Sequence, residues 1–213
     1  MSGETSLVIA IDGPAASGKS TVAKQLAAEL QIVFVSSGGM YRAFTWWVLE
    51  NGVDPADTVA VEALLEKTVF QCGEENNIGT IAVNGRLPEW KQLANDRVNG
   101  GVSLVAAIPA VRLRLVDEQR AYARKRGVVM EGRDIGSVVF PDTPYKFYID
   151  ASPEVRERRR RAEGIDDSIA ARDKMDSSRE ASPLVIPKDA TVVDSSHLTV
   201  EEVVEKVKEV IVG

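Results

Sequence analysis

Residues 13–20 read G-P-A-A-S-G-K-S, a complete G-x-x-x-x-G-K-[ST] pattern placed directly after the apolar run 7–11. The apolar run predicts a buried strand and residues 21–30 predict a helix, so the pattern stands in the strand–loop–helix context that it needs. Glycines let the backbone curl until successive N–H groups point into one concavity, and the start of the helix adds partial positive charge. These residues therefore predict a phosphate-binding loop.

Two side chains of this loop have separate expected tasks. Lys19 would reach the outer phosphates of a nucleotide, and Ser20 would offer its hydroxyl to Mg²⁺. The full set of residues expected to bind the phosphate donor in this segment is Gly13, Pro14, Ala15, Ala16, Ser17, Gly18, Lys19, Ser20 and Thr21.

Apolar runs alternate with helical patterns along most of the chain. Strands are expected at 7–11, 32–35, 128–130, 145–149 and 190–193. Helices are expected at 21–30, 40–50, 59–66, 94–105 and 110–126, from Pro153 onward, and after the capping box that begins at Thr199. This alternation predicts an α/β fold with a five-stranded parallel sheet and helices on both faces.

Residues 68–90 break this alternation. Two short strands, 69–72 and 80–83, are expected on either side of a polar loop at 73–79, and Asn84-Gly85 is a strong hairpin turn signal. The segment therefore predicts a small antiparallel insertion on the parallel-sheet domain.

Composition limits the classes of function. The formal net charge of −6 argues against a nucleic-acid or membrane-surface partner, since both need a basic footprint. No apolar run reaches bilayer-spanning length, and the first six residues lack a signal segment. Cys72 and His197 are single residues of their types, which excludes an internal disulfide and a Cys/His metal cluster. We expect a cytoplasmic monomer.

A phosphate-binding loop alone leaves switch GTPases, motor ATPases and small-molecule kinases open. The chain has no N-K-x-D to read guanine and no D-x-x-G to sense a γ-phosphate, which argues against a switch GTPase. A set of arginines at the junctions between elements instead predicts a second anionic substrate; the set is Arg42, Arg112, Arg133, Arg172 and Arg179. The block E-G-R-D-I-G at 131–136 follows the strand at 128–130, where α/β sheets place their ligands.

Several blocks of the sequence carry a resemblance that runs nearly from end to end. They are I-D-G-P at 11–14 with the loop after it, S-G-G-M-Y-R at 37–42, S-L-V-A-A-I-P-A-V-R at 103–112, Q-R at 119–120, E-G-R-D-I-G-S-V-V-F-P at 131–141, R-D-K-M-D-S-S-R at 172–179 and A-S-P-L at 181–184. With these blocks the chain resembles the bacterial cytidylate kinases, a branch of the nucleoside monophosphate kinase family.

The resemblance implies an activity and a division of the chain. The activity is transfer of the γ-phosphoryl group of ATP to CMP or dCMP, with Mg²⁺ as the cofactor. The division is a core at 1–36, 108–155 and 180–213, a part that binds the nucleoside monophosphate (NMP) at 37–107, and a short arginine-rich lid at 156–179. The alternatives are an adenylate or uridylate kinase, or a P-loop regulator that binds nucleotide without transferring phosphate.

The resemblance also implies roles for individual residues. Ser103, Arg112 and Asp134 would read cytosine, with Asp134 and Ser103 accepting from the exocyclic amine and Arg112 donating to the ring. Arg42, Arg133 and Arg179 would hold the acceptor's phosphate, and Arg172 and Asp176 would suit the ribose. Ser37 and Tyr41 are further expected substrate-binding residues. Lys19, Arg133 and Arg172 would act on the transferring group, and Arg156 and Arg160 would reach the ATP phosphates as the lid closes. No general base is required, because this reaction depends on positioning and charge neutralisation.

The chain departs from the family pattern at two positions near these residues. Ser36 stands where the family usually has aspartate, and Ala94 stands where it commonly has arginine. The substrate contact of that arginine would be lost or would move to Lys91 or Arg97.

Overall fold

The computed structural model describes residues 6–162, 173 and 183–213. Its strands are β1 (Val8–Asp12), β2 (Val33–Ser36), β3 (Phe70–Glu75), β4 (Ile78–Val83), β5 (Val128–Gly132), β6 (Tyr145–Asp150) and β7 (Thr191–Asp194). Its helices are α1 (Lys19–Glu29), α2 (Ser37–Glu50), α3 (Thr58–Glu66), α4 (Trp90–Leu93), α5 (Asp96–Val105), α6 (Pro109–Ala123), the π-helix η1 (Ile135–Val139), α7 (Pro153–Ala162) and α9 (Val200–Val212). The strands and helices expected from the sequence are present in the expected order, and α4 and η1 are two further helices that were not expected.

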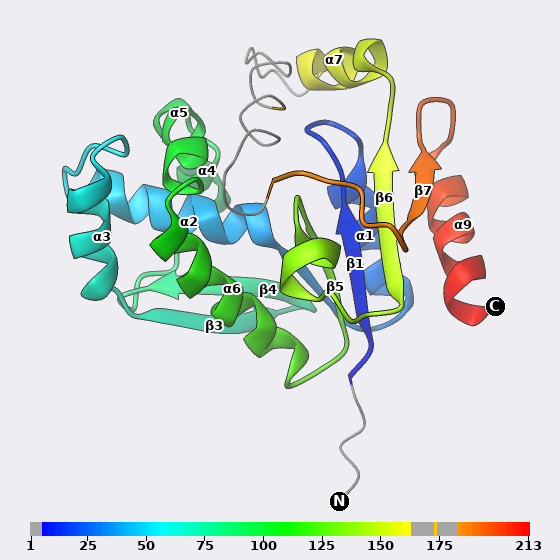
Figure 1. Ribbon diagram of the computed structural model, residues 1–213, viewed down its shortest axis with the longest axis horizontal. Helices are drawn as coiled ribbons and strands as arrows, with labels where there is room; N and C mark the ends of the chain where they lie inside the picture. Colours follow the sequence, from blue (N-terminus) through cyan, green and yellow to red (C-terminus); the bar gives the residue numbers. More distant parts are fainter. Residues whose placement is uncertain (1–5, 163–172, 174–182) are drawn as a thin grey trace, which may run out of the picture.

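The strands form one mixed sheet in the order β3-β4-β2-β5-β1-β6-β7 (Figure 1). The five strands from β2 to β7 in this order are parallel to their neighbours, as expected. The expectation of a five-stranded sheet is nevertheless wrong in one respect, because the insertion is not a separate sheet. Strand β4 joins β2 through the single parallel pair Phe34↔Ile78, and β3 pairs antiparallel with β4 at the edge.

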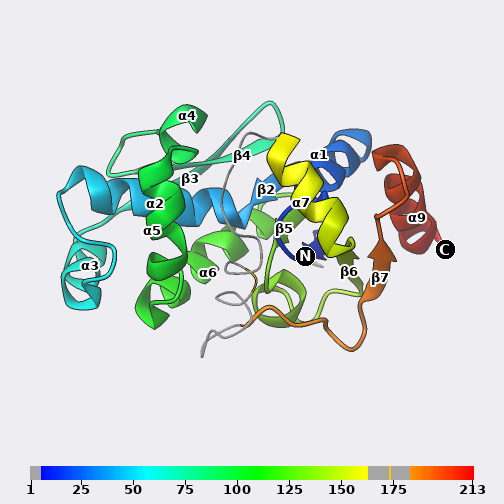
Figure 2. The ribbon, with the colours of Figure 1, turned by 90° about the horizontal axis from the view of Figure 1, so that it is seen from above.

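Successive side chains along each strand point to opposite faces of the sheet. Both faces are apolar, and each has its own core. Ile9 and Ile11 of β1 face the core that α1 and α9 cover, whereas Ala10 faces the larger core that α2, α3, α5 and α6 cover (Figure 2). Helices therefore lie on both faces, which is the arrangement that a parallel sheet requires to bury its strands.

The hairpin of the insertion turns at a different place from the one that the sequence indicated. The expected polar loop at 73–79 is mostly strand, since β3 and β4 pair as far as Glu75↔Ile78. The turn is made by Asn76 and Asn77, whose φ values of 52° and 59° match the two positive angles of a type I′ turn. Asn84 and Gly85 also have positive φ, but they form a second turn after β4.

Two helices begin where their caps allow and not where the apolar pattern suggested. Helix α2 starts three residues earlier than expected, at Ser37, because the Ser36 side chain caps it and accepts from the Gly39 N–H at 3.3 Å. The helix expected at 94–105 is α5, which begins two residues later, at Asp96, because the Asn95 side chain caps it; the short helix α4 before it was not expected.

The carboxyl ends of the parallel strands meet at one edge of the sheet. Strand β1 ends at Asp12, β2 at Ser36 and β5 at Gly132, and each is followed by a segment that the sequence assigned to the site. Helix α7 lies beyond the end of β6 at the same edge, at the top of Figure 1. The fold therefore brings segments far apart in the sequence to one place.

In the described part of the chain, no single helix has the length and apolar content to cross a bilayer. The pair α5 and α6 passes that test of length and composition only when the two are taken together across a bend of 99°.

We predict that Phe44→Ala destabilises the protein by about 3–5 kcal/mol, since Phe44 is fully buried and its ring packs edge-on against Phe70 at a centroid distance of 5.6 Å. Val59→Ala is the control, because Val59 is 78% exposed and should change stability by less than about 0.5 kcal/mol. Urea unfolding measures both variants, and equal losses would contradict this packing.

Candidate functional site

The phosphate-binding loop leaves β1 at the middle of the sheet, where glycine is required at two positions. A Cβ on Gly13 would lie 2.1 Å from the carbonyl oxygen of Ile149 in β6, so no larger residue fits at this position. Gly18 has a φ of 88° and caps the start of α1 in the left-handed conformation. The glycines of the pattern are thus explained by a close approach and by a turn.

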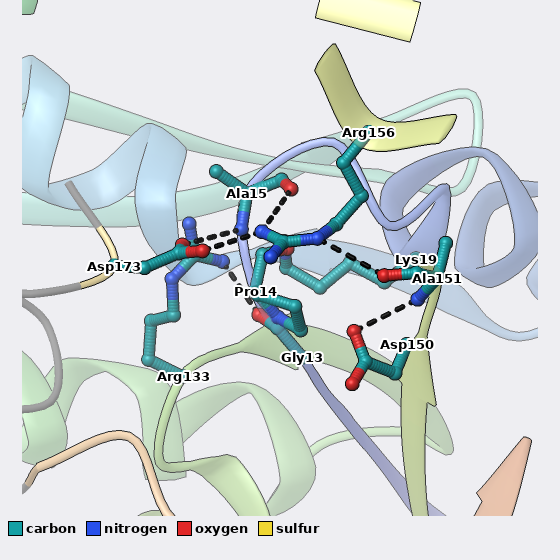
Figure 3. A network of polar contacts seen from close by, with 9 residues as sticks. All are labelled: Gly13, Pro14, Ala15, Lys19, Arg133, Asp150, Ala151, Arg156 and Asp173. Atoms are coloured by element: carbon teal, nitrogen blue, oxygen red, sulfur yellow. Dashed lines mark hydrogen bonds and ion pairs between the residues drawn. The ribbon is translucent and has the colours of Figure 1, made fainter. Parts of the chain in front are cut away.

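Three arginines hold the carbonyl groups of alternate residues in this loop. The pairs are Arg133 with Gly13 (2.9 Å), Arg156 with Ala15 (3.3 Å) and Arg159 with Ser17 (3.1 Å), each through Nη1 to the carbonyl oxygen. Figure 3 shows the first two of these pairs. Held in this way, the carbonyls are not free to rotate toward a ligand, which leaves the loop's N–H groups to do the binding.

An acidic side chain already uses one of those N–H groups. The carboxylate of Asp173 accepts from the N–H of Ala15 at 3.4 Å and pairs with Arg156 at 2.5 Å (Figure 3). Lys19 is buried and donates to the carbonyl of Pro14 at 3.0 Å. One N–H group of the loop therefore already has a carboxylate oxygen as its acceptor.

One cleft of about 380 Å³ joins this loop to the opposite side of the sheet edge. Of the residues expected to bind the donor, those that line it are Ala15, Ala16, Gly18, Lys19, Ser20, Thr21 and Arg160. Of those expected to bind the acceptor, those that line it are Ser37, Tyr41, Arg42, Ser103, Arg112, Arg133 and Asp134. The structure thus brings most of both predicted sets into a single space.

Arg112 of α6 and Asp134 before η1 form a buried ion pair in the wall of the cleft. Both residues are almost fully buried, at 3% and 4% exposed, and Ser103 lies in the same wall at 8%. Arg112 also donates to the carbonyl of Ala106 at 3.0 Å and lies over the ring of Tyr41. Its Nε is buried without a hydrogen-bond partner among the described residues, which leaves a donor for a polar ligand.

The guanidinium of Arg42 lies on the other wall, held from the junction of α4 and α5. Its Nη1 donates to the carbonyl of Leu93 at 2.8 Å and to Oδ1 of Asn99 at 2.7 Å. The side chain reaches this junction from α2 because the two helices pack together.

Asp12 links the phosphate-binding loop, which follows it in the chain, to η1, which follows Asp134. Its carboxylate is 1% exposed and accepts from the N–H groups of Ile135 at 2.8 Å and Gly136 at 2.7 Å, so it fixes the first turn of η1. Burial raises the pKa of Asp12 to about 7, even though both N–H groups and Lys19 favour the charged form. Asp134 adds to the rise.

The remaining predicted residues fall into two groups. Gly13, Pro14, Ser17 and Arg156 do not line the cleft but shape or hold the loop from behind. Arg172, Asp176 and Arg179 lie outside the described residues. Neither Lys91 nor Arg97 replaces the arginine missing at Ala94: both are exposed and neither lines the cleft, and Lys91 pairs with Glu89 at the surface.

Several residues that the structure places in or beside the site were given no role there from the sequence. They are Asp12, Ser36, Trp90, Asn99, Glu131, Arg159, Asp173 and Ser195. Glu131 and Asp12 carried a usable signal, because each is a charged residue at the carboxyl end of an apolar run. Asn99 and Arg159 carried none, since their importance depends on which residue the fold places opposite them.

A second, smaller cavity of about 280 Å³ lies beyond the loop and shares Ala16, Gly18 and Thr21 with the main cleft. Its apolar wall comes from α1 and from the start of α9. Arg159 and Ser195 line its polar side, where Arg159 donates to the Ser195 hydroxyl at 3.1 Å and to its carbonyl at 2.8 Å.

A phosphate-binding loop after the parallel strand β1, with Arg42, Arg112 and Arg133 lining the same cleft, defines a P-loop kinase. Residues 9–212 match the family model described as cytidylate kinase. The chain is 42% identical to a cytidylate kinase of Clostridium botulinum (strain Langeland), covering 95% of this chain and 96% of the relative. It is also 42% identical to that of Mycobacterium leprae, covering 94% and 93%. The chain belongs to the cytidylate kinase family.

A further relative is a longer protein. The chain is 40% identical to a bifunctional pantoate ligase/cytidylate kinase of Synechococcus, and the match covers 95% of this chain but only 44% of that relative.

We predict that the free energy of unfolding of the wild-type protein falls, relative to that of Asp12→Asn, as the pH rises from about 5 to 7. A carboxyl whose pKa is higher in the folded state binds more protons there, so its favourable contribution is complete at acid pH and is lost as the pH rises toward 7. The slope of the stability difference should be about 1 kcal/mol per pH unit. Urea unfolding of both proteins at several pH values measures it, and a difference independent of pH would contradict the buried carboxyl.

Proposed function

We propose that this protein transfers the γ-phosphoryl group of ATP to CMP or dCMP, giving ADP and CDP or dCDP. The observation that carries the proposal is the single cleft that joins the phosphate-binding loop to the buried group of Ser103, Arg112 and Asp134. A loop alone would support nucleotide binding, whereas a second polar pocket facing it supports a second substrate.

The donor half is the loop with the cavity beyond it. The polyphosphate of ATP would lie on the loop's N–H groups and Lys19, with Arg156 and Arg160 of α7 on its other side. The base of ATP would occupy the second cavity, because that cavity is continuous with the loop and has an apolar wall for a ring.

The residues present also fit a magnesium ion. Ser20 lines the cleft on the loop side, and the carboxylate of Glu131 lines it at the end of β5, next to β1. Mg²⁺ is typically held by one or two carboxylates together with substrate phosphates, so a larger acidic cluster is not needed. With ATP bound, Mg²⁺ at Ser20 and Glu131 would supply positive charge that offsets the charge of the phosphates. Ser36 donates to Glu131 at 2.5 Å and would orient that carboxylate.

The acceptor half would read the base with three buried groups. Asp134 and Ser103 accept from the exocyclic amine of cytosine, and Arg112 donates to the ring carbonyl and nitrogen. A base with a carbonyl in place of the amine would bring an acceptor against the oxygens of Asp134 and Ser103. These buried oxygens would then lack a donor, which lowers the affinity for that base. Arg42, Ser37 and Tyr41 would hold the phosphate end, and Arg172, Asp176 and Arg179 are proposed to complete the site.

The reaction would then proceed by positioning. An oxygen of the acceptor's phosphate attacks the γ-phosphorus of ATP, and the bond from that phosphorus to the bridging oxygen breaks, so that the electron pair leaves with ADP. Lys19, Arg133 and Arg172 would stabilise the charge spread over the transferring group. No residue has to remove a proton, since a phosphate oxygen is already an anionic nucleophile.

Other expectations remain predictions. These are the division into a core at 1–36, 108–155 and 180–213, an NMP-binding part at 37–107 and a lid at 156–179, a monomeric state, a cytoplasmic location, and the absence of nucleic-acid and membrane partners.

We predict that ADP release from Mg·ATP is fastest with CMP or dCMP and at least about 100-fold slower with UMP or AMP, because buried acceptors reject a base without the amine in the right place. A coupled assay with each acceptor in turn measures it. Faster turnover with AMP or UMP would support the adenylate or uridylate alternative, and no turnover with any acceptor would support a non-catalytic regulator.

We predict that Asp134→Ala raises the KM for CMP by about 10-fold to 100-fold while changing the KM for ATP by less than about twofold, since a hydrogen bond to a charged group is lost only at the acceptor. Asp134→Asn is the matched control, because it keeps the shape of the side chain and one acceptor oxygen beside Arg112. Steady-state kinetics measures both constants, and equal changes in the two would contradict a role in base reading.

A further inference from the structure

Asp12 directly precedes the phosphate-binding loop, but its carboxylate is hydrogen-bonded to the segment that follows Asp134. Its Oδ1 accepts from the N–H of Ile135 at 2.8 Å, and its Oδ2 accepts from the N–H of Gly136 at 2.7 Å. We propose that Asp12 is a positioning residue, which holds Asp134 in place through the first turn of η1 and so sets the selectivity of the acceptor site for its base. This role rests on the proposed function, because it assumes that Asp134 reads that base.

The peptide group between Asp134 and Ile135 is held at both of its ends. Its N–H donates to Asp12, and its carbonyl, which belongs to Asp134, accepts from the N–H groups of Val138 at 2.9 Å and Val139 at 3.1 Å. Because a peptide group is planar, holding both ends also fixes the bond that joins it to the Cα of Asp134. The side chain of Asp134 therefore leaves the backbone from a defined place.

The other end of η1 is held from α6. The guanidinium of Arg120 donates through Nε to the carbonyl of Val139 and through Nη2 to the carbonyl of Val138, both at 2.9 Å. Turns of π-helix are rare and are frequently found at functional sites. This one lies between two charged side chains, Asp12 at its start and Arg120 at its end, and Asp134 stands immediately before it.

Holding this turn requires a carboxylate at position 12. Two consecutive N–H groups point at the side chain, and a carboxylate offers each of them an oxygen of its own. An amide has one oxygen and one NH₂ group, so in Asp12→Asn one of the two N–H groups would face another donor. Because Asp12 is 1% exposed, solvent does not supply a replacement acceptor. We therefore expect the first turn of η1 to shift in this variant.

A shift of η1 would act on the buried pair that Asp134 forms with Arg112. Arg112 is also held by the carbonyl of Ala106 at 3.0 Å, so the two partners are positioned from different elements. A displaced Asp134 carboxylate would lose its alignment with the amine of a bound base, and the selectivity between bases would fall. If Asp12 acted instead through the nearby charge of Lys19, the affinity for ATP would change most. The two roles therefore predict different results.

The test measures the affinities for CMP, UMP and ATP by calorimetric titration. It is run at about pH 8, above the pKa of about 7 to which burial raises Asp12, so that the carboxylate is charged. We expect Asp12→Asn to lower the ratio of CMP affinity to UMP affinity about tenfold, as for a lost hydrogen bond to a charged group, and to change ATP affinity by less than about twofold. A loss of folded protein would not change this ratio, because it affects both ligands equally.

Asp150→Asn is the matched control. Asp150 ends β6, the strand beside β1, and its carboxylate accepts from the N–H of Ala151 at 2.8 Å, but it does not line the cleft. The amide of the variant keeps an oxygen for that single N–H, so the ratio of CMP affinity to UMP affinity should stay at the wild-type value.

Two further variants separate the route through η1 from other effects. Arg120→Ala loosens the far end of η1 from α6, and it should also lower the ratio, by about threefold or more. In Asp134→Ala the residue that Asp12 positions is gone, so adding Asp12→Asn should lower the ratio no further.

Three results would overturn the proposal: an additive loss in the double variant, a larger change in ATP affinity than in the ratio, or an unchanged ratio in either Asp12→Asn or Arg120→Ala. Turnover of CMP by the wild-type protein is measured separately. A protein that prefers CMP to UMP but transfers no phosphate would contradict the proposed function alone, whereas a wild type without that preference would overturn both.

Discussion

The buried carboxylate of Asp12 is the interaction on which both halves of the site depend. It ends β1 immediately before the phosphate-binding loop, and it accepts from the first two N–H groups of η1 immediately after Asp134. Burying a carboxylate is costly, and two short hydrogen bonds offset that cost only in part, which is why its pKa is raised. The phosphate-binding loop and Asp134 therefore lie next to one fixed point, so their separation does not depend on surface segments.

Two arginines of the cleft have different surroundings. Arg112 is paired with the Asp134 carboxylate, so the pair is nearly neutral as a unit and combines donors with acceptors in one buried group. Arg42 donates to the Leu93 carbonyl and to the Asn99 amide at the junction of α4 and α5. The fold therefore places guanidiniums with different partners on two walls of the same cleft.

The sequence predicted the elements of this fold better than their boundaries and contacts. The phosphate-binding loop and the five parallel strands were predictable, because glycine spacing and apolar runs are local signals. The joining of β4 to β2 was not, since a single pair at Phe34 and Ile78 leaves no mark in either run. The asparagines at 76 and 77 were predictable in principle, because two adjacent asparagines tolerate the left-handed angles of a hairpin turn.

In the site too, local sequence patterns were predictable and tertiary contacts were not. Ser103, Arg112 and Asp134 were found through blocks of sequence that carry the family resemblance, and the structure places all three around one buried space. Arg133 and Arg156 were expected on phosphates, and the structure shows them on loop carbonyls, a partner that no side-chain pattern specifies. Asn99 and Arg159 could not be found, because each is defined by a tertiary contact with a distant residue.

Arginines bind the carbonyls of every second residue from Gly13 to Ser17, and this affects the electrostatics of the loop. Each guanidinium aligns a peptide dipole, and three dipoles fixed at alternate positions give the short loop a persistent polarisation before any nucleotide arrives. Water around a phosphate must reorient whenever the charge on that phosphate changes, whereas dipoles fixed by the protein do not. The peptide dipoles of the loop would therefore keep their orientation while the charge on a bound phosphate changes.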